Sequence, residues 1–230
     1  MGGEWMADMG EMLAALLARR RSVRGFAADE VPAAQMERIF SHARLSPSNC
    51  NVQPWIVHVV SGGKAAEMRQ ALERAATERA EARPDFPLTQ AYSGPYRSRQ
   101  VDAAKALFAA TGVEREDRQA RYASFIRNFR FFDAPHAAFI FLPPWAGWRE
   151  AADVGMYAQA LMLSMAAEGL ASCAQATLSH HADVVKHVLG IDEELGLLLG
   201  IAFGFEDRDH PANRTRTTRA PLAENHVFHR

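Results

Sequence analysis

RRSVRGF at residues 20–26 and SPSNCNVQPW at residues 46–55 carry the strongest indication of fold and function in this chain. The first stretch sets Arg20, Arg21 and Arg24 around Ser22. Arginine offers a planar fork of donors that matches phosphate oxygens, and serine adds a hydroxyl donor. The stretch predicts a phosphate clamp or, alternatively, a basic helix end whose cations stabilise the helix C-terminus.

The second stretch is rich in amide and hydroxyl side chains and has prolines near both ends. Amides carry paired donors and acceptors that suit the edge of a heterocycle, and proline restricts the loop to extended or turn geometry. An ordinary turn between a helix and the strand-like WIVHVV is the alternative. Near the C-terminus, four arginines could supply a second phosphate contact or form a solvated charge run: Arg208, Arg214, Arg216 and Arg219.

The composition narrows the possible classes. The chain has 230 residues, of which 48% are hydrophobic, and a formal net charge of −1, so a large core is expected and general affinity for nucleic acid or membranes is not. No apolar run approaches the ~20 residues that span a bilayer. The start, MGGEWMADMG, lacks a basic region and a long apolar core, so we expect no secretion signal. We expect a cytoplasmic protein.

Hydrophobic periodicity predicts one α+β or α/β domain over residues 1–230. The expected strands are 55–61, 136–144, 170–176 and 195–205, with a late strand-like HVF at 226–228. Prolines and a glycine break up residues 83–98, which predicts a long irregular segment. Helices are expected at 6–20, 33–45, 63–82, near 97–110 and 115–130, at 149–169 and at 181–189.

Other catalytic motifs are missing from the sequence. His180, His181 and His187 have neither i,i+4 nor HExxH spacing, so no metal is expected. The two cysteines, Cys50 and Cys173, have no nucleophile motif and are expected to be buried structural thiols. The chain contains no GxSxG, no P-loop and no GxGxxG after a strand, which disfavours serine-hydrolase, P-loop and Rossmann functions.

In combination, these segments resemble the nitroreductase family of FMN-dependent oxidoreductases. The resemblance runs from about residue 15 to the end and also rests on DVGMYAQALMLSMAAEGLASCAQ, GIAFGFED and NRTRTTRAPLAE. SNCNVQPW and SCAQ look most like the nitrobenzoate-reductase branch. The resemblance implies an α+β nitroreductase-like fold with a mostly antiparallel central sheet flanked by helices.

The resemblance also implies cofactor contacts. Arg20, Ser22 and Arg219 would bind the FMN phosphate, Arg21 would contribute through its backbone, and Arg216 would lie nearby. Arg24 would reach the pyrimidine edge or the ribityl chain. The loop at residues 46–55, called the amide loop below, would contribute from the partner subunit through Pro47, Ser48, Asn49, Asn51 and Gln53. The end of the third expected strand and the residues after it would contribute through backbone contacts of Gln175, Ala176, Thr177 and Leu178.

In such a protein, NAD(P)H would reduce FMN, leave, and give its place to a nitroaromatic or quinone-like acceptor in a ping-pong cycle. The flavin carries the hydride chemistry, so no catalytic side chain is expected. Family members are intertwined homodimers, and the tail 207–230 would wrap the partner. No nucleic-acid or membrane partner is implied.

By its position, the segment 83–131 would be the variable excursion over the active site that selects the substrate. Its aromatic side chains could stack on a substrate ring, and Arg97, Arg99 or Arg127 could pair with a carboxylate. Helix packing or solvation is the alternative for each of these residues. The aromatic candidates are Phe86, Tyr92, Tyr96, Phe125 and Phe129.

Two other functions stay open. The same fold and flavin could serve reductive dehalogenation, enone reduction or substrate dehydrogenation. A binding protein without catalysis, whose basic tail holds an anionic partner, would be colourless and bind in a salt-sensitive way.

Overall fold

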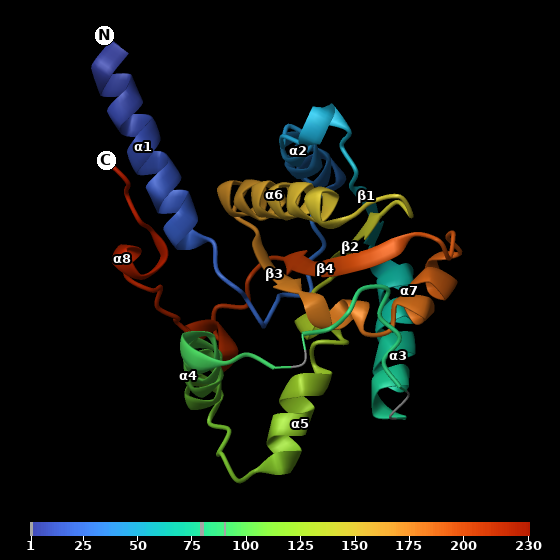
Figure 1. Ribbon diagram of the computed structural model, residues 1–230. Helices are drawn as coiled ribbons and strands as arrows, with labels where there is room; N and C mark the ends of the chain where they lie inside the picture. The colour runs from blue at the N-terminus through green and yellow to red at the C-terminus, as the bar shows by residue number, and fades with distance from the viewer. Residues whose placement is uncertain (1, 79–80, 90) are drawn as a thin grey trace.

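A four-stranded antiparallel sheet in the order β1-β2-β4-β3 forms the centre of the molecule (Figure 1). The computed structural model describes residues 2–78, 81–89 and 91–230. The α+β fold with a largely antiparallel sheet that was expected from the sequence is confirmed. The strands are β1 (Ile56–Val60), β2 (His136–Leu142), β3 (Ala171–Gln175) and β4 (Gly196–Gly204).

The continuous apolar run of β2 makes it a central strand that is buried on both faces. All of its residues are buried. Because successive side chains of a strand point to opposite faces, Phe139 and Phe141 enter one hydrophobic cluster while Ile140 and Leu142 enter the other. The two clusters are therefore joined through one strand.

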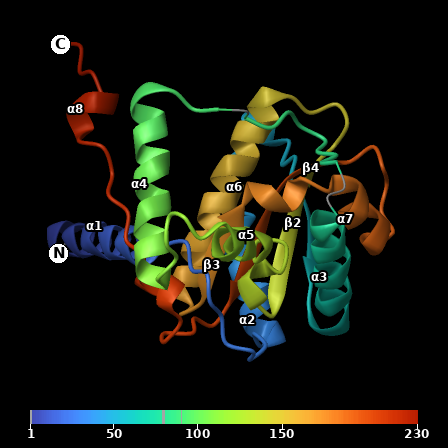
Figure 2. The same cartoon turned by 90° about the horizontal axis from the view of Figure 1, so that it is seen from below.

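Helices cover both faces of the sheet (Figures 1 and 2). α2 (Ala33–Ala43) and α6 (Trp148–Ala167) pack on one face. α3 (Gly62–Thr77), α5 (Arg118–Ile126) and α7 (Ala182–Leu189) contribute to the other. At the start of α6, the Glu150 carboxylate accepts from the Gly147 N–H at 2.8 Å and so caps the first turn. Gly169, with φ +81°, ends the turn that follows the helix.

Both termini leave the body of the molecule on the same side (Figures 1 and 2). α1 (Gly2–Arg19) exposes a stripe of large apolar side chains: Met9, Met12, Leu13 and Leu17. The tail that contains α8 (Leu222–Asn225) exposes Leu222, Val227 and Phe228. Contiguous exposed apolar surface of this kind is typical of an interaction face.

Several details differ from the sequence-based expectation. The segment 94–98 is helical, because α4 (Gly94–Thr111) begins there with Pro95 in its first turn, where a missing N–H costs nothing. The late HVF stretch is not a strand: it lies beyond the described sheet and its side chains have no core to face. Cys173 is buried as expected and burial raises its thiol pKa, but Cys50 is exposed.

Four short 3₁₀ turns lie among the described residues. They are η1 (Asn49–Asn51), η2 (Phe131–Asp133), η3 (Ala176–Ser179) and η4 (Pro211–Arg214). The expected helix at 115–130 is shorter than the pattern suggested, because α5 ends at Ile126 and η2 follows. The last residues expected for the 63–82 helix, 79–80, lie outside the described residues.

Candidate functional site

An extended segment connects α1 to the edge of the sheet. Ser22 forms a parallel bridge with Ser172 of β3, and the Val23 N–H donates to the Ser172 carbonyl at 3.0 Å. This pairing holds the three predicted phosphate-binding arginines, Arg20, Arg21 and Arg24, beside the first residues of β3.

A cavity of about 470 Å³, here called the arginine pocket, lies next to this segment. It brings the N-terminal arginines together with Arg216 and Arg219 of the tail, although the two groups are far apart in the sequence, whereas Arg208 lines a different cavity. α4 closes one side through Ala103. The lining residues are Leu17, Ala18, Arg20, Arg21, Ser22, Arg24, Ala103, Thr215, Arg216, Thr217 and Arg219.

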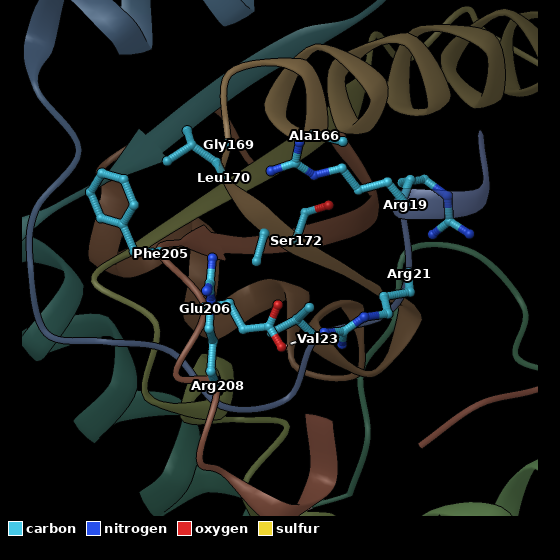
Figure 3. A pocket seen from close by; sticks show the side chains of 12 residues that line it. Arg19, Arg21, Val23, Ala166, Gly169, Leu170, Ser172, Phe205, Glu206 and Arg208 are labelled. Atoms are coloured by element: carbon cyan, nitrogen blue, oxygen red, sulfur yellow. Dashed lines mark hydrogen bonds and ion pairs between the residues drawn. The ribbon is translucent and has the colours of Figure 1, made fainter. Parts of the chain in front are cut away.

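Two residues of the arginine pocket carry buried polar atoms that have no hydrogen-bond partner among the described residues. They are Arg21 Nη1 and Thr215 Oγ1. The other terminal guanidinium nitrogen of Arg21, Nη2, forms an ion pair with the Glu206 carboxylate. Figure 3 shows Glu206 in an adjoining smaller cavity of about 160 Å³. An unsatisfied buried polar group costs about 1–3 kcal/mol. The arginine pocket is therefore chemically suited to a phosphate, and Thr215 is a residue that the sequence analysis missed.

Arg24 is held in place by a side chain of the tail. Its backbone N–H donates to Asn213 Oδ1 at 2.8 Å, and its guanidinium carbon lies 5.9 Å from the centroid of the Phe132 ring. The Asn213 Nδ2 atom donates to the carbonyls of Gly25 and Asp207, at 2.8 and 2.7 Å. Asn213 thus joins the arginine segment to the start of the tail.

The predicted 175–178 segment lies at the far end of β3. Ser172 and Gln175 are three residues apart along this strand, which corresponds to about 10 Å. Gln175 Nε2 donates to the Asn128 carbonyl at 3.0 Å, whereas its buried Oε1 has no partner among the described residues. β3 is an edge strand, so the arginine pocket and this segment form an elongated site along one edge of the sheet.

A close approach fixes η3 against the sheet. A Cβ atom at Gly200 would lie 2.5 Å from Leu178 Cδ1, so only glycine allows this packing. Leu178 is buried, whereas Ala176 is exposed and Thr177 is half-buried. Ala176 and Thr177 therefore reach the surface, where a ligand can contact them.

The amide loop is anchored on the first half of α6. The Asn49 N–H donates to Asp153 Oδ2 at 3.1 Å, and the Gln53 N–H donates to Ser48 Oγ at 2.9 Å. At the end of the loop, Trp55 stacks on Tyr157 with 4.8 Å between ring centroids. Burial raises the pKa of Tyr157 to about 12, so its hydroxyl stays protonated.

The same loop has an unusual backbone. Cys50, Asn51 and Gln53 have φ values of +47°, +58° and +48°, in a region that costs a non-glycine residue roughly 1 kcal/mol or more. Pro47, Asn49 and Asn51 are exposed, and Ser48 is half-buried. Such strain in an exposed, polar loop favours a functional role over a simple connecting turn.

One chain does not bring the loop and the arginine segment together. The loop contacts α6 at Asp153, whereas Arg20 and Arg21 share a cavity with Ala166 near the other end of that helix. Asp153 and Ala166 are 13 residues apart in the helix, which corresponds to about 20 Å. The two regions of one chain are therefore far apart compared with the three-residue span from Ser172 to Gln175.

The predicted substrate contacts are dispersed. Phe86 lines an apolar cavity beside η3, whereas Phe129 is 1% exposed and packs edge-on against Phe125, with 5.5 Å between ring centroids. Phe86 shares that cavity with Ala176 of the 175–178 segment. The other candidates lie exposed at or near the start of α4: Tyr92, Tyr96 and Arg97.

Neither a metal site nor a membrane-spanning helix is found among the described residues. Among residues 2–78, 81–89 and 91–230, no group of three or more His, Cys, Asp or Glu side chains is placed to hold a metal ion. None of the helices in this part of the chain is both long and apolar enough to cross a bilayer.

Comparison with known proteins identifies the class. The model of the nitroreductase family matches residues 17–205, so the chain belongs to this family. The resemblance inferred from the motifs is thereby confirmed.

Individual relatives cover nearly the whole chain. Nitroreductase NfnB of Mycolicibacterium smegmatis is 41% identical over 225 residues, which are 97% of this chain and 95% of that protein. A 4-nitrobenzoate reductase of Nocardioides sp. is 30% identical, with coverage of 95% and 90%. The crystal structure of the FMN-dependent NfnB from Mycobacterium smegmatis in complex with NADPH superposes with a TM-score of 0.93 at 39% identity, over 96% of this chain and 100% of that one.

Proposed function

We propose that this protein is an FMN-dependent oxidoreductase that transfers hydride from NAD(P)H to a nitroaromatic or quinone-like acceptor. The observation that carries the proposal is the elongated site, which has phosphate-binding chemistry at one end of β3 and an accessible backbone segment at the other. Solved relatives described as FMN- and NADPH-dependent nitroreductases support the same cofactor and donor. We take NADPH as the first donor to test.

The residues fit FMN in type and order. Arg20, Arg219 and the unpartnered Thr215 hydroxyl would hold the phosphate, with Arg216 beside them. The 175–178 backbone would lie along the ring system, and Gln175 Oε1 is a buried acceptor still free for a donor. When bound, FMN supplies the two-electron hydride chemistry of the reaction.

The overall reaction needs no acid or base beyond solvent. A nitroaromatic, NADPH and one proton give the nitroso compound, NADP⁺ and water, so two electrons and one oxygen atom are accounted for. Arg24, fixed by Asn213 and Phe132, would place a positive charge near the polar end of the ring system, where it stabilises developing negative charge.

The protein is further proposed to act as a homodimer. The apolar stripe of α1 and the exposed tail residues Leu222, Val227 and Phe228 support this assembly. The separation of about 20 Å between the amide loop and the arginine segment supports it independently. In the dimer, the loop of one copy would complete the flavin site of the other. The exposed thiol of Cys50 favours a reducing compartment such as the cytoplasm.

A visible spectrum tests the function. We expect the purified protein to show flavin bands near about 370 and 450 nm that bleach under anaerobic NADPH and return when a nitroaromatic is added. A flavin spectrum that neither NADPH nor NADH bleaches would favour dehalogenation, enone reduction or substrate dehydrogenation. A colourless protein that also takes up no added FMN would refute the proposal and favour an anion-binding protein.

Removal of the tail tests the dimer. Because Asn213 belongs to the fold of each copy, the truncation should begin after Arg219, which keeps both tail arginines of the arginine pocket. We expect the protein that lacks residues 220–230 to sediment as a monomer with little bound flavin.

A matched point variant controls for local effects of this truncation. Glu224→Gln removes the ion pair with Arg99, whose nitrogen–oxygen distance is 2.6 Å, but keeps the tail. This variant should stay dimeric. A truncated protein that still sediments as a flavin-bound dimer would exclude the tail as the element that joins the two copies.

A further inference from the structure

A separate cavity of about 410 Å³ lies between the start of the 83–131 segment, the N-terminal turns of α6 and η3. Small-molecule sites commonly have volumes of about 300–1,000 Å³, so a substituted aromatic ring fits. We call it the apolar pocket. Its described lining residues are Phe86, Pro87, Leu88, Thr89, Ala146, Gly147, Trp148, Ala151, Ala176, Ser179 and Leu198.

A partly buried ion pair, between the buried Lys186 and the more exposed Asp85, fixes the wall of this pocket. Asp85 Oδ1 lies 2.7 Å from Lys186 Nζ, and Asp85 Oδ2 accepts from the Leu197 N–H at 2.7 Å. Lys186 is 7% exposed and also donates to the carbonyls of Glu193 and Leu195. These contacts hold the chain immediately before Phe86 against the start of β4.

Phe86 itself occupies space that only a glycine leaves open. A Cβ atom at Gly196 would lie 2.7 Å from the Phe86 ring. The ring is therefore seated on the β4 backbone and forms a preorganised apolar wall, which lowers the entropic cost of binding a flat ligand.

The described lining of the apolar pocket is uncharged and has few polar groups. None of its described residues has a charged side chain, and the polar side-chain groups are the hydroxyls of Thr89 and Ser179 and the indole N–H of Trp148. Several lining residues are exposed, so a carboxylate that enters the pocket loses only part of its hydration, but it meets no cationic side chain among the described lining residues, which is unfavourable. A neutral ring meets no such penalty.

We propose that the apolar pocket receives the aromatic ring of a neutral acceptor and selects against acceptors that carry a carboxylate. This inference rests on the proposed function, because Ala176 belongs both to the pocket and to the segment along which the flavin ring would lie. The pocket is thus next to the flavin segment and determines specificity by exclusion of charge. The predicted pairing of Arg97 with a substrate carboxylate is not needed.

The test compares two acceptors of nearly equal size. We expect kcat/KM for 4-nitrobenzamide to exceed that for 4-nitrobenzoate by at least about tenfold. Thr89→Arg adds a cation at an exposed position of the lining and should raise kcat/KM for 4-nitrobenzoate several-fold while it leaves the amide almost unchanged. The matched control is Thr77→Arg, an exposed site on α3, which should leave the ratio at its wild-type value.

Equilibrium binding supplies a second readout that needs no turnover. Calorimetry on the holoprotein should detect benzamide more strongly than benzoate, and Thr89→Arg should narrow that difference. Two results would overturn the pocket assignment alone. One is a flavin-containing wild type that uses 4-nitrobenzoate as well as, or better than, 4-nitrobenzamide. The other is an equal kcat/KM ratio for the two acceptors in Thr89→Arg and Thr77→Arg. Absence of flavin and of all nitro reduction would instead overturn the proposed function, and calorimetry would still decide whether the pocket prefers neutral rings.

Discussion

The double variant Arg20→Ala/Arg219→Ala is expected to purify almost free of flavin. These arginines come from opposite ends of the sequence and line the same pocket, so their removal leaves a bound phosphate with too few cationic partners. A hydrogen bond to a charged group contributes about 1.5–3 kcal/mol, so two such losses weaken FMN binding by roughly 10²- to 10⁴-fold. The measurement is the flavin-to-protein absorbance ratio, followed by titration of the apoprotein with FMN.

A matched variant separates this effect from general loss of charge. Arg97→Ala removes an exposed arginine of α4 that bonds only to Gln100 among the described residues, and it should retain full flavin content. Arg20→Lys/Arg219→Lys should bind FMN with intermediate affinity, because lysine keeps the charge but not the bidentate geometry. Full flavin occupancy in the double alanine variant would refute the phosphate clamp.

Asn213→Ala is expected to have the largest effect on stability. The side chain is 4% exposed and makes three hydrogen bonds, with the Arg24 N–H and the carbonyls of Gly25 and Asp207. Truncation leaves the Arg24 N–H without a partner, whereas the Gly25 and Asp207 carbonyls still accept from the N–H groups of Asp207 and His210, so we expect a loss of roughly 2–3 kcal/mol in the free energy of unfolding. Urea denaturation of the apoprotein measures this loss without a contribution from FMN.

The control for this prediction is an asparagine outside the body of the molecule. Asn225→Ala lies in α8, is exposed, and should change the unfolding free energy by less than about 0.5 kcal/mol. If both alanine variants unfold at the same urea concentration, Asn213 does not join the tail to the arginine segment in the way the geometry indicates.

The elements with strong apolar patterns could be predicted from the sequence. β2 is a continuous apolar run between prolines, and α6 repeats apolar residues at helical spacing, so burial specifies both. The HVF stretch has the composition of a strand, but a strand needs a hydrogen-bonding neighbour, and the described sheet offers none at that place. Pattern alone cannot supply this information.

The candidate site also contains residues that have a recognisable sequence signal and residues that have none. The arginines could be predicted as phosphate contacts because their chemistry suits phosphate at almost any spacing, and this stays a prediction. Thr215 and Asn213 could not be predicted, since a hydroxyl or an amide becomes informative only when folding buries it and removes its partners. The tie between Asp85 and Lys186 joins residues about a hundred positions apart, and no local signal relates them.

The distance between the two ends of α6 has a consequence for stoichiometry. In the proposed dimer, each chain gives its arginine segment to one flavin and its amide loop to the other. A substitution in a single chain of a mixed dimer then removes one contact from one site, whereas two substitutions at opposite ends of α6 in the same chain impair both sites. Two chains that are each defective at a different end would still form one site with no altered residue.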